Sequence, residues 1–158
     1  MNTAMDSTPK DDAFFMAAAL EMGRSVNGRT GENPAVGCVL VHEGRIVGRG
    51  ATQPPGGAHA EVMAIREAEA AGYDVAACDL YVILEPCNFH GHTPPCSRLI
   101  VAKRPRRVVV AITDPHPRVQ GRGILEMRGA GLEVVEGVLA DEVRGHLAGW
   151  LARYSRSA

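Results

Sequence analysis

The chain has 158 residues, of which 46% are hydrophobic and 22% charged, a balance typical of one soluble globular domain. Its formal net charge of -1 lacks the basic excess of nucleic-acid-binding domains. No run of about 18 apolar residues predicts a membrane span, and the polar start at residues 1–12 does not look like a secretory leader. We therefore expect a cytoplasmic protein without nucleic-acid or membrane partners, whose four cysteines serve a metal or catalysis rather than disulfides.

The N-terminal part of the chain predicts a helix followed by a hairpin. Residues 1–11 are expected to be a disordered tail, and residues 12–158 a single domain. A helix capped by Asp11 or Asp12 is expected to continue to about Val26 and to end at Asn27-Gly28. Two apolar runs then flank Glu43-Gly44, which predicts a β-hairpin with strands at 35–41 and 45–48.

Helical and strand patterns alternate over the rest of the chain. The expected helices are 59–71, 93–103, 121–130 and 139–154, and the expected strands are 80–84, 107–112 and 132–136. Thr93 is the expected cap of the second of these helices, with Pro94 in its first position. The alternation predicts a three-layer α/β/α domain with a mostly parallel sheet.

One histidine and two cysteines stand at expected helix starts and a strand end. His59 opens a helix, Cys87 follows a strand and Cys96 lies near the start of the next helix. An imidazole with two thiolates is the ligand set of a catalytic zinc site, which keeps a fourth position open. Glu61 is two residues from His59, so it is placed to reach water on the metal and act as a general acid/base.

Each of these residues also has an ordinary interpretation when taken alone. A lone histidine is usually a surface residue, and a lone cysteine is usually a small buried hydrophobe, which is how we interpret Cys38 and Cys78. The combination of His-x-Glu, Pro-Cys and a second cysteine is the signature of zinc deaminases, although eight residues separate Cys87 from Cys96 instead of the common two.

The sequence segments around these residues resemble one family in particular. The segments that carry the resemblance are Asn33-Pro34-Ala35-Val36-Gly37-Cys38, His59-Ala60-Glu61-Val62, Leu84-Glu85-Pro86-Cys87, Gly91-His92-Thr93-Pro94-Pro95-Cys96, Asp114-Pro115-His116-Pro117 and Gly121-Arg122-Gly123. They are similar to the deaminase domain of the bifunctional riboflavin-biosynthesis deaminase/reductase, over about residues 12–150. The long gap between the cysteines is typical of that family.

The resemblance implies a cytidine deaminase-like fold, with a five-stranded mixed sheet between helices. It also implies His59, Cys87 and Cys96 as Zn²⁺ ligands, Glu61 as the proton shuttle and Asn33 as a contact of the substrate ring. The family reaction removes an amino group from a phosphoribosylated diaminopyrimidinone and releases ammonia. No reductase domain and no NADPH site are expected in this chain, and the resemblance implies a homo-oligomer, a dimer or a tetramer.

Several positions depart from the family pattern around the expected substrate pocket. Thr52 stands where the family usually has His, Asn88-Phe89 where it has Ser-His, His92 where it has Arg or Lys, and His116 where it has Asn. With Ala60 and Asp114, these residues and Asn33 are our candidates for substrate contact. Phe89 offers an aromatic face to a flat heterocycle or a guanidinium, or it only packs its loop. His90, His92 and His116 are substrate contacts or surface residues without a role.

These departures lead us to expect the same hydrolytic deamination on a different small molecule. Losing a cation weakens phosphate binding, so an unphosphorylated heterocycle or a guanidino compound such as arginine is favoured, unless Arg49, Lys103, Arg118 or Arg122 replaces the cation. The alternative is the riboflavin-pathway reaction itself. A nucleic-acid-editing deaminase and a structural zinc module are the weaker hypotheses. The last expected helix carries Leu147, Trp150, Leu151 and Tyr154, which cover either an oligomer interface or the domain's own sheet.

Overall fold

A five-stranded mixed sheet forms the centre of the domain. The computed structural model describes residues 10–88 and 95–155. The strands lie in the order β2-β1-β3-β4-β5 and span Gly37–His42 (β1), Arg45–Ala51 (β2), Asp79–Leu84 (β3), Arg107–Ile112 (β4) and Glu133–Glu136 (β5). β1 pairs antiparallel with both β2 and β3, whereas β3, β4 and β5 are parallel. Four strands therefore run in one direction, and β1 alone runs in the other because the hairpin inserts it beside β3. The sheet is mixed, as the family resemblance implied.

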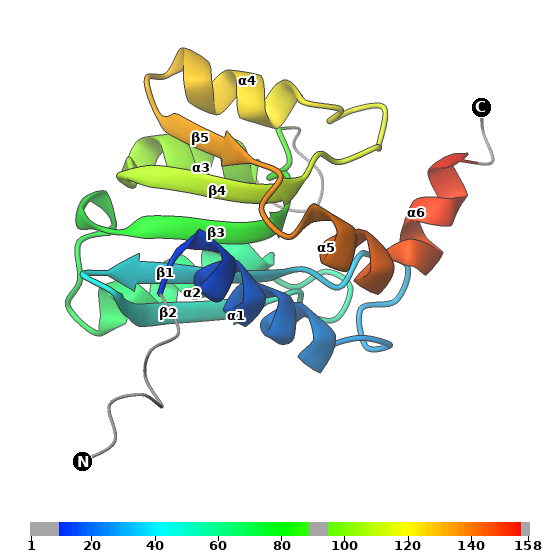
Figure 1. Cartoon of the computed structure of the whole chain (residues 1–158), viewed down its shortest axis with the longest axis horizontal. Helices are drawn as coiled ribbons and strands as arrows, with labels where there is room; N and C mark the ends of the chain where they lie inside the picture. Colours follow the sequence, from blue (N-terminus) through cyan, green and yellow to red (C-terminus); the bar gives the residue numbers. More distant parts are fainter. Residues whose placement is uncertain (1–9, 89–94, 156–158) are drawn as a thin grey trace.

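Helices cover both faces of this sheet, which confirms the three-layer architecture. They span Asp12–Ser25 (α1), Ala60–Ala70 (α2), Cys96–Lys103 (α3), Arg122–Gly129 (α4), Ala140–His146 (α5) and Ala148–Ser155 (α6), with a short 3-10 helix at Val75–Ala77 (η2). In Figure 1, α1 and α5 lie in front of the sheet, and α2 and α3 lie behind it. No helix within the described ranges is both long enough and apolar enough to cross a membrane.

Two helix boundaries differ from the sequence-based expectation. The α3 helix begins at Cys96 with Pro95 as its N-cap, later than the expected start. The expected cap Thr93 and the expected helical Pro94 lie outside the described residues. The single helix expected over 139–154 is divided at Leu147, which forms the C-cap of α5.

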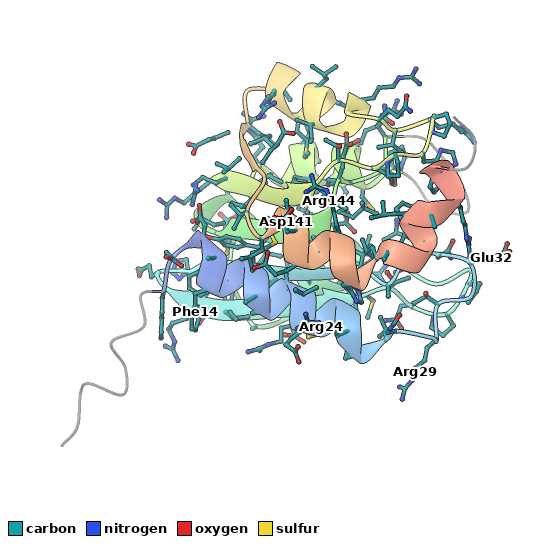
Figure 2. The ribbon with its side chains drawn as sticks, turned by 45° about the vertical axis from the view of Figure 1, so that its right-hand side comes forward. Phe14, Arg24, Arg29, Glu32, Asp141 and Arg144 are labelled. Carbon is teal, nitrogen blue, oxygen red and sulfur yellow. The ribbon has the colours of Figure 1, made fainter. Side chains whose placement is uncertain are left out.

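The expected start of α1 and the expected hairpin turn are both confirmed. The Asp11 carboxylate accepts a hydrogen bond of 3.0 Å from the backbone N–H of Phe14, which caps the helix. Glu43 and Gly44 have φ angles of 48° and 78°, the left-handed geometry of a two-residue type I′ turn. Figure 2 shows charged side chains, among them Arg24 and Arg144, on the outer surfaces of α1 and α5.

The apolar core lies between the central strands and the helices. In each of the strands β1, β3 and β4, all residues but one are buried, as expected for strands covered on both faces. Cys38 and Cys78 are fully buried in this core, which agrees with their interpretation as small hydrophobes. At Gly50 of β2, an added Cβ would collide with the backbone oxygen of Ala60. This glycine therefore lets the first turn of α2 lie directly against the sheet.

The apolar residues at the C-terminus cover the domain's own structure. Leu147 is 3% exposed, and Trp150 and Leu151 are half-buried against the core. Their apolar character is therefore largely accounted for within one chain. The expected oligomer stays a prediction.

Candidate active site

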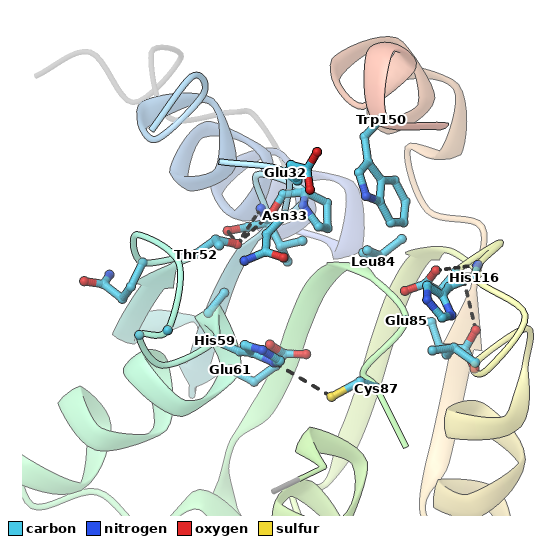
Figure 3. A pocket seen from close by; sticks show the side chains of 18 of the residues that line it. Glu32, Asn33, Thr52, His59, Glu61, Leu84, Glu85, Cys87, His116 and Trp150 are labelled. Carbon is cyan, nitrogen blue, oxygen red and sulfur yellow. Dashed lines mark hydrogen bonds between the residues drawn. The ribbon is translucent and has the colours of Figure 1, made fainter. Parts of the chain in front are cut away.

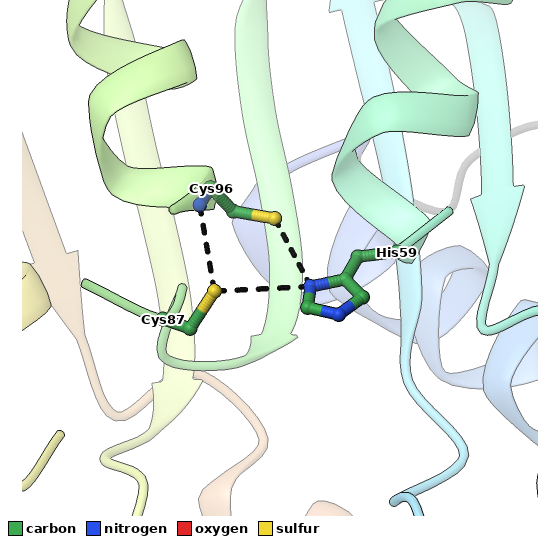
Figure 4. A group of neighbouring side chains, drawn as sticks. All are labelled: His59, Cys87 and Cys96. Atoms are coloured by element: carbon green, nitrogen blue, oxygen red, sulfur yellow. Dashed lines mark hydrogen bonds between the residues drawn. The ribbon is translucent and has the colours of Figure 1, made fainter. Parts of the chain in front are cut away.

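Three metal-ligating side chains converge from three different elements. His59 is the N-cap of α2, Cys87 follows β3, and Cys96 is the first residue of α3. The His59 Nδ1 atom lies 3.2 Å from the Cys96 Sγ atom and 3.8 Å from the Cys87 Sγ atom (Figure 4). The backbone N–H of Cys96 donates to Cys87 Sγ at 3.4 Å. The residues that the sequence predicted as metal ligands are thus neighbours in space.

The donor set and its spacing fit a zinc ion. One ligand atom from each of the three residues lies within 4.8 Å of the other two. Ligands that share a tetrahedral zinc stand roughly 3.5–3.8 Å apart, given usual Zn–S and Zn–N bond lengths. The described residues supply three ligand atoms, and three protein ligands with an open fourth position are the arrangement of a catalytic rather than a structural site.

Burial and hydrogen bonds shift the pKa values of the titratable groups in this cluster. A hydrogen bond with Cys96 lowers the pKa of Cys87 to about 4 against the opposing effect of burial, with a further contribution from His59. The hydrogen bond with Cys87 raises the pKa of His59. Cys87 is thus predisposed to the thiolate form that binds metal.

Glu61 is a carboxylate held beside the cluster in the first turn of α2. Its side chain is 5% exposed, and burial raises its pKa to about 7, with the nearby Cys87 adding to the rise. A pKa near the working pH suits a group that must both take and return a proton. Glu61 therefore lies beside the candidate metal ligands, where the sequence predicted it, and its role as the proton shuttle stays a prediction.

A cavity of about 370 Å³ opens above these residues. His59, Ala60, Glu61 and Cys87 are among its lining residues, and Figure 3 shows His59, Glu61 and Cys87 on the side opposite Trp150. The remaining lining residues are Glu32, Asn33, Pro34, Val36, Thr52, Gln53, Gly56, Gly57, Leu84, Glu85, Asp114, His116, Val119 and Tyr154. The cavity thus contains five of the predicted substrate-contacting residues, Asn33, Thr52, Ala60, Asp114 and His116.

Thr52 holds the loop that carries Asn33. The Thr52 hydroxyl donates to the carbonyl of Pro34 at 3.0 Å and accepts from the N–H of Val36 at 2.9 Å. The Thr30 hydroxyl donates to the Asn33 carbonyl at 2.6 Å. Thr52 therefore joins the end of β2 to the Asn33 loop.

Asp114 and His116 form the loop after β4 on the other side of the cavity. The Asp114 carboxylate accepts from the N–H of His116 at 2.8 Å, and the His116 ring accepts from the N–H of Arg118 at 3.1 Å. Burial raises the pKa of Asp114 to about 6, and the charge of Glu85 adds to the rise. This loop presents a carboxyl group and an imidazole ring to the cavity.

Three of the predicted substrate contacts are not placed in the cavity. Asn88 is not among its described lining residues, and its buried Oδ1 atom has no hydrogen-bond partner within the described structure. Phe89 and His92 lie outside the described residues, as does His90. Their roles stay predictions.

Sequence analysis missed Glu85 and the aromatic pair of α6 as site residues. The buried Glu85 carboxylate accepts hydrogen bonds from the backbone N–H groups of Asp114, Gly121 and Ile124, at 2.9–3.0 Å. A carboxylate at the end of an apolar strand was a signal for this role. For Trp150 the sequence held no signal, because an aromatic residue on an amphipathic helix is equally expected in the core.

Comparison with known proteins identifies the family. Residues 9–112 match the cytidine and deoxycytidylate deaminase zinc-binding region. The chain belongs to this family of deaminases. Zinc as the cofactor and the cytidine deaminase-like fold are thereby confirmed, and the structure places His59, Cys87 and Cys96 as the candidate site for the metal.

Relatives within this family are riboflavin biosynthesis proteins. The chain is 42% identical over 142 residues to riboflavin biosynthesis protein RibD of Escherichia coli and 44% identical over 128 residues to the chloroplastic protein PYRD of Zea mays. These alignments cover 90% and 81% of this chain, but only 38% and 32% of the relatives. The chain thus spans about a third of their length.

A solved structure extends this similarity to three dimensions. It is the diaminohydroxyphosphoribosylaminopyrimidine deaminase/5-amino-6-(5-phosphoribosylamino)uracil reductase of Thermotoga maritima, with a TM-score of 0.85 and 38% identity. The match covers 92% of this chain and 42% of that protein. The deaminase domain is therefore similar in both sequence and fold to that of the riboflavin-pathway enzymes.

Proposed function

We propose that this deaminase acts on the phosphoribosylated diaminopyrimidine of riboflavin biosynthesis. The observation that carries this proposal is the similarity over 92% of the chain to the Thermotoga maritima enzyme named for that reaction. The expectation of a shifted substrate finds no support in the comparisons, since the relatives at 42–44% identity are named for riboflavin biosynthesis. Residues 12–158 act as one domain in this proposal.

His59, Cys87 and Cys96 hold zinc, and Glu61 moves the proton. When bound, zinc acts as a Lewis acid that lowers the pKa of water and so supplies the nucleophile. Glu61 accepts a proton from the attacking water and passes it to the departing amino group. The ring carbon thus gains a bond to oxygen and loses its bond to nitrogen, and ammonia leaves.

The opposite wall binds and orients the ring. Asn33 offers an amide that both donates and accepts hydrogen bonds, as the edge of an aminopyrimidine requires. The loop that carries it is fixed by Thr52 and Thr30, so the amide enters the reaction already positioned. Ala60, Asp114 and His116 complete the contacts in this proposal.

The charge of the cavity favours a second candidate substrate of the same chemistry. Among the described lining residues there is no lysine or arginine, and four are carboxylic acids, Glu32, Glu61, Glu85 and Asp114. Arg49, Lys103, Arg118 and Arg122 are not lining residues, and Lys103 pairs with Glu69 at 2.6 Å. An unphosphorylated aminopyrimidine would avoid bringing phosphate near these acids.

Ammonia release from a substrate panel tests both candidates. The panel contains the phosphoribosylated diaminopyrimidine, its dephosphorylated form, guanine and arginine, each with zinc-loaded protein. We expect kcat/KM to be highest for the phosphorylated compound. A tenfold preference for the dephosphorylated form would instead support the second candidate. Absence of ammonia release from all four compounds would contradict both.

A further inference from the structure

The C-terminal helix α6 forms a wall of the cavity that the family match does not include. Trp150 and Tyr154 of α6 line the cavity, whereas the match ends at residue 112. Figure 3 shows the indole of Trp150 reaching down toward Leu84, across the cavity from His59 and Glu61. This aromatic side chain therefore faces the space that the substrate would occupy on the side away from the proton-transfer group.

Several contacts hold α6 at this position. The Arg153 guanidinium donates to the carbonyl of Glu32 at 2.9 Å, next to Asn33. The His146 ring lies 2.8 Å from the carbonyl of Ala35, in the same loop. Leu147, between the two helices, is 3% exposed. The α6 helix is thus joined to the Asn33 loop through Arg153, and the end of the preceding α5 is joined to it through His146. Trp150 lies between these two attachments in the chain.

The rings around Trp150 restrict its orientation. Its ring centroid lies 5.1 Å from that of Tyr154 at an interplanar angle of 63°. The Tyr154 ring lies in turn 5.8 Å from the His116 ring. A large, flat and uncharged side chain held in this way presents a preorganised apolar surface to a ligand.

We infer that Trp150 determines specificity by packing against the part of the substrate that does not react, the carbon face of the ribose. This inference rests on the proposed function. The reacting carbon must lie beside Glu61, so the substituent on the far side of the ring meets the opposite wall. A contact of this kind exists equally before and during the reaction, so its loss raises KM and leaves kcat unchanged.

Trp150 also provides its own probe, because it is the only tryptophan in the chain. The first experiment titrates zinc-loaded Glu61→Gln protein, which binds without turning over, with the phosphoribosylated diaminopyrimidine while tryptophan emission is recorded. We expect a saturable change in emission. N-acetyltryptophanamide, titrated in the same way, corrects for light absorbed by the compound. A flat response after this correction would overturn the inference.

The second experiment separates specificity from catalysis. We expect Trp150→Ala to raise KM at least tenfold with kcat within about threefold of the wild type, and Trp150→Phe to recover most of the lost KM. Leu125→Ala, on the exposed face of α4, is the matched control and should change neither constant. Zinc content and the melting temperature establish that each variant is folded, and Trp150→Leu, which removes the flat ring but keeps an apolar side chain, serves if Trp150→Ala is not.

The outcomes distinguish this inference from the proposed function. If the wild type releases no ammonia from the compound, the proposed function fails. If the wild type is active but the KM of folded Trp150→Ala or Trp150→Leu is unchanged, only the role of Trp150 fails. A fall in kcat at constant KM would likewise overturn it, because Trp150 would then act on the chemical step.

Discussion

The two walls of the cavity are built in different ways. The metal wall consists of His59, Glu61, Cys87 and Cys96, which all belong to helix starts or strand ends within the family match. The substrate wall consists of the Asn33 loop, the loop after β4, and α6, which meet through hydrogen bonds such as that from Arg153 to Glu32. Metal chemistry needs donor atoms placed within a fraction of an ångström, which rigid elements supply.

This difference separates what the reaction requires from what the substrate requires. Few substitutions are tolerated in the metal wall, because each of its side chains either binds the metal or transfers a proton in the proposed function. The substrate wall is held by contacts between segments far apart in the chain, so one of its residues can change without moving a zinc ligand. Substitutions in the first wall should therefore act on kcat, and substitutions in the second on KM.

The largest effect is expected from Glu61→Gln. The amide keeps the shape of the side chain but cannot take a proton, so kcat should fall about 10²–10⁴-fold. Bound zinc, measured by atomic emission, should remain near one per chain. Cys87→Ser is the contrasting variant, since it should lose both zinc and activity. Near-normal turnover by Glu61→Gln would contradict the assignment of the proton shuttle.

Glu85→Gln should destabilise the protein without moving a zinc ligand. The carboxylate accepts three backbone N–H groups, and the amide would turn a donor toward at least one of them. We expect a loss of about 2–3 kcal/mol in the free energy of unfolding, measured by urea titration at pH 7. An unchanged midpoint would show that Glu85 does not fix the loop after β4.

The metal wall was predictable from the sequence because short motifs encode it. His59 and Glu61 occupy one helix start, and the elements around Cys87 and Cys96 could be recognised from apolar runs and prolines. The alternation of elements likewise predicted the three layers. The direction of β1 was not predictable from alternation, because it depends on which strand the hairpin joins.

The substrate wall was only partly predictable, for a physical reason. Asn33, Asp114 and His116 were marked by motifs that resemble the family, but Trp150 is brought to the cavity by the packing of α5 and α6. Contacts such as that of His146 with Ala35 join residues 111 positions apart. Nothing in the local pattern of either segment indicates such a pairing.

Asp12→Asn should lower stability at the far end of the sheet and leave both walls intact. Arg107 donates to Asp12 at 2.7 and 3.1 Å, which lowers the pKa of Asp12 below its ordinary value of 3.8. Since the folded state has the lower pKa, this stabilisation is complete above about pH 5 and is lost as the pH falls through that lowered value.

The wild type should therefore exceed Asp12→Asn by about 1–2 kcal/mol in the free energy of unfolding at pH 7. Urea titrations at pH 7, 5 and 3.5 measure this difference, which should narrow only at the lowest pH. KM and kcat at pH 7 should match the wild type. A difference that grows toward acid pH would contradict the role of the ionised carboxylate.

The smallest effect is expected from Arg153→Ala, which removes only the hydrogen bond between α6 and the Glu32 carbonyl. Its guanidinium is exposed and makes one hydrogen bond to the Glu32 carbonyl, so the free energy of unfolding should change by less than about 1 kcal/mol. Loosening α6 should nevertheless let Trp150 move, and KM should rise about two- to fivefold at constant kcat. Arg153→Lys, which keeps a donor, should recover part of this rise. Initial-rate kinetics of the two variants and the wild type measure KM and kcat. A change in kcat alone would mean that the two walls are coupled, and that substrate recognition and chemistry cannot be altered separately in this domain.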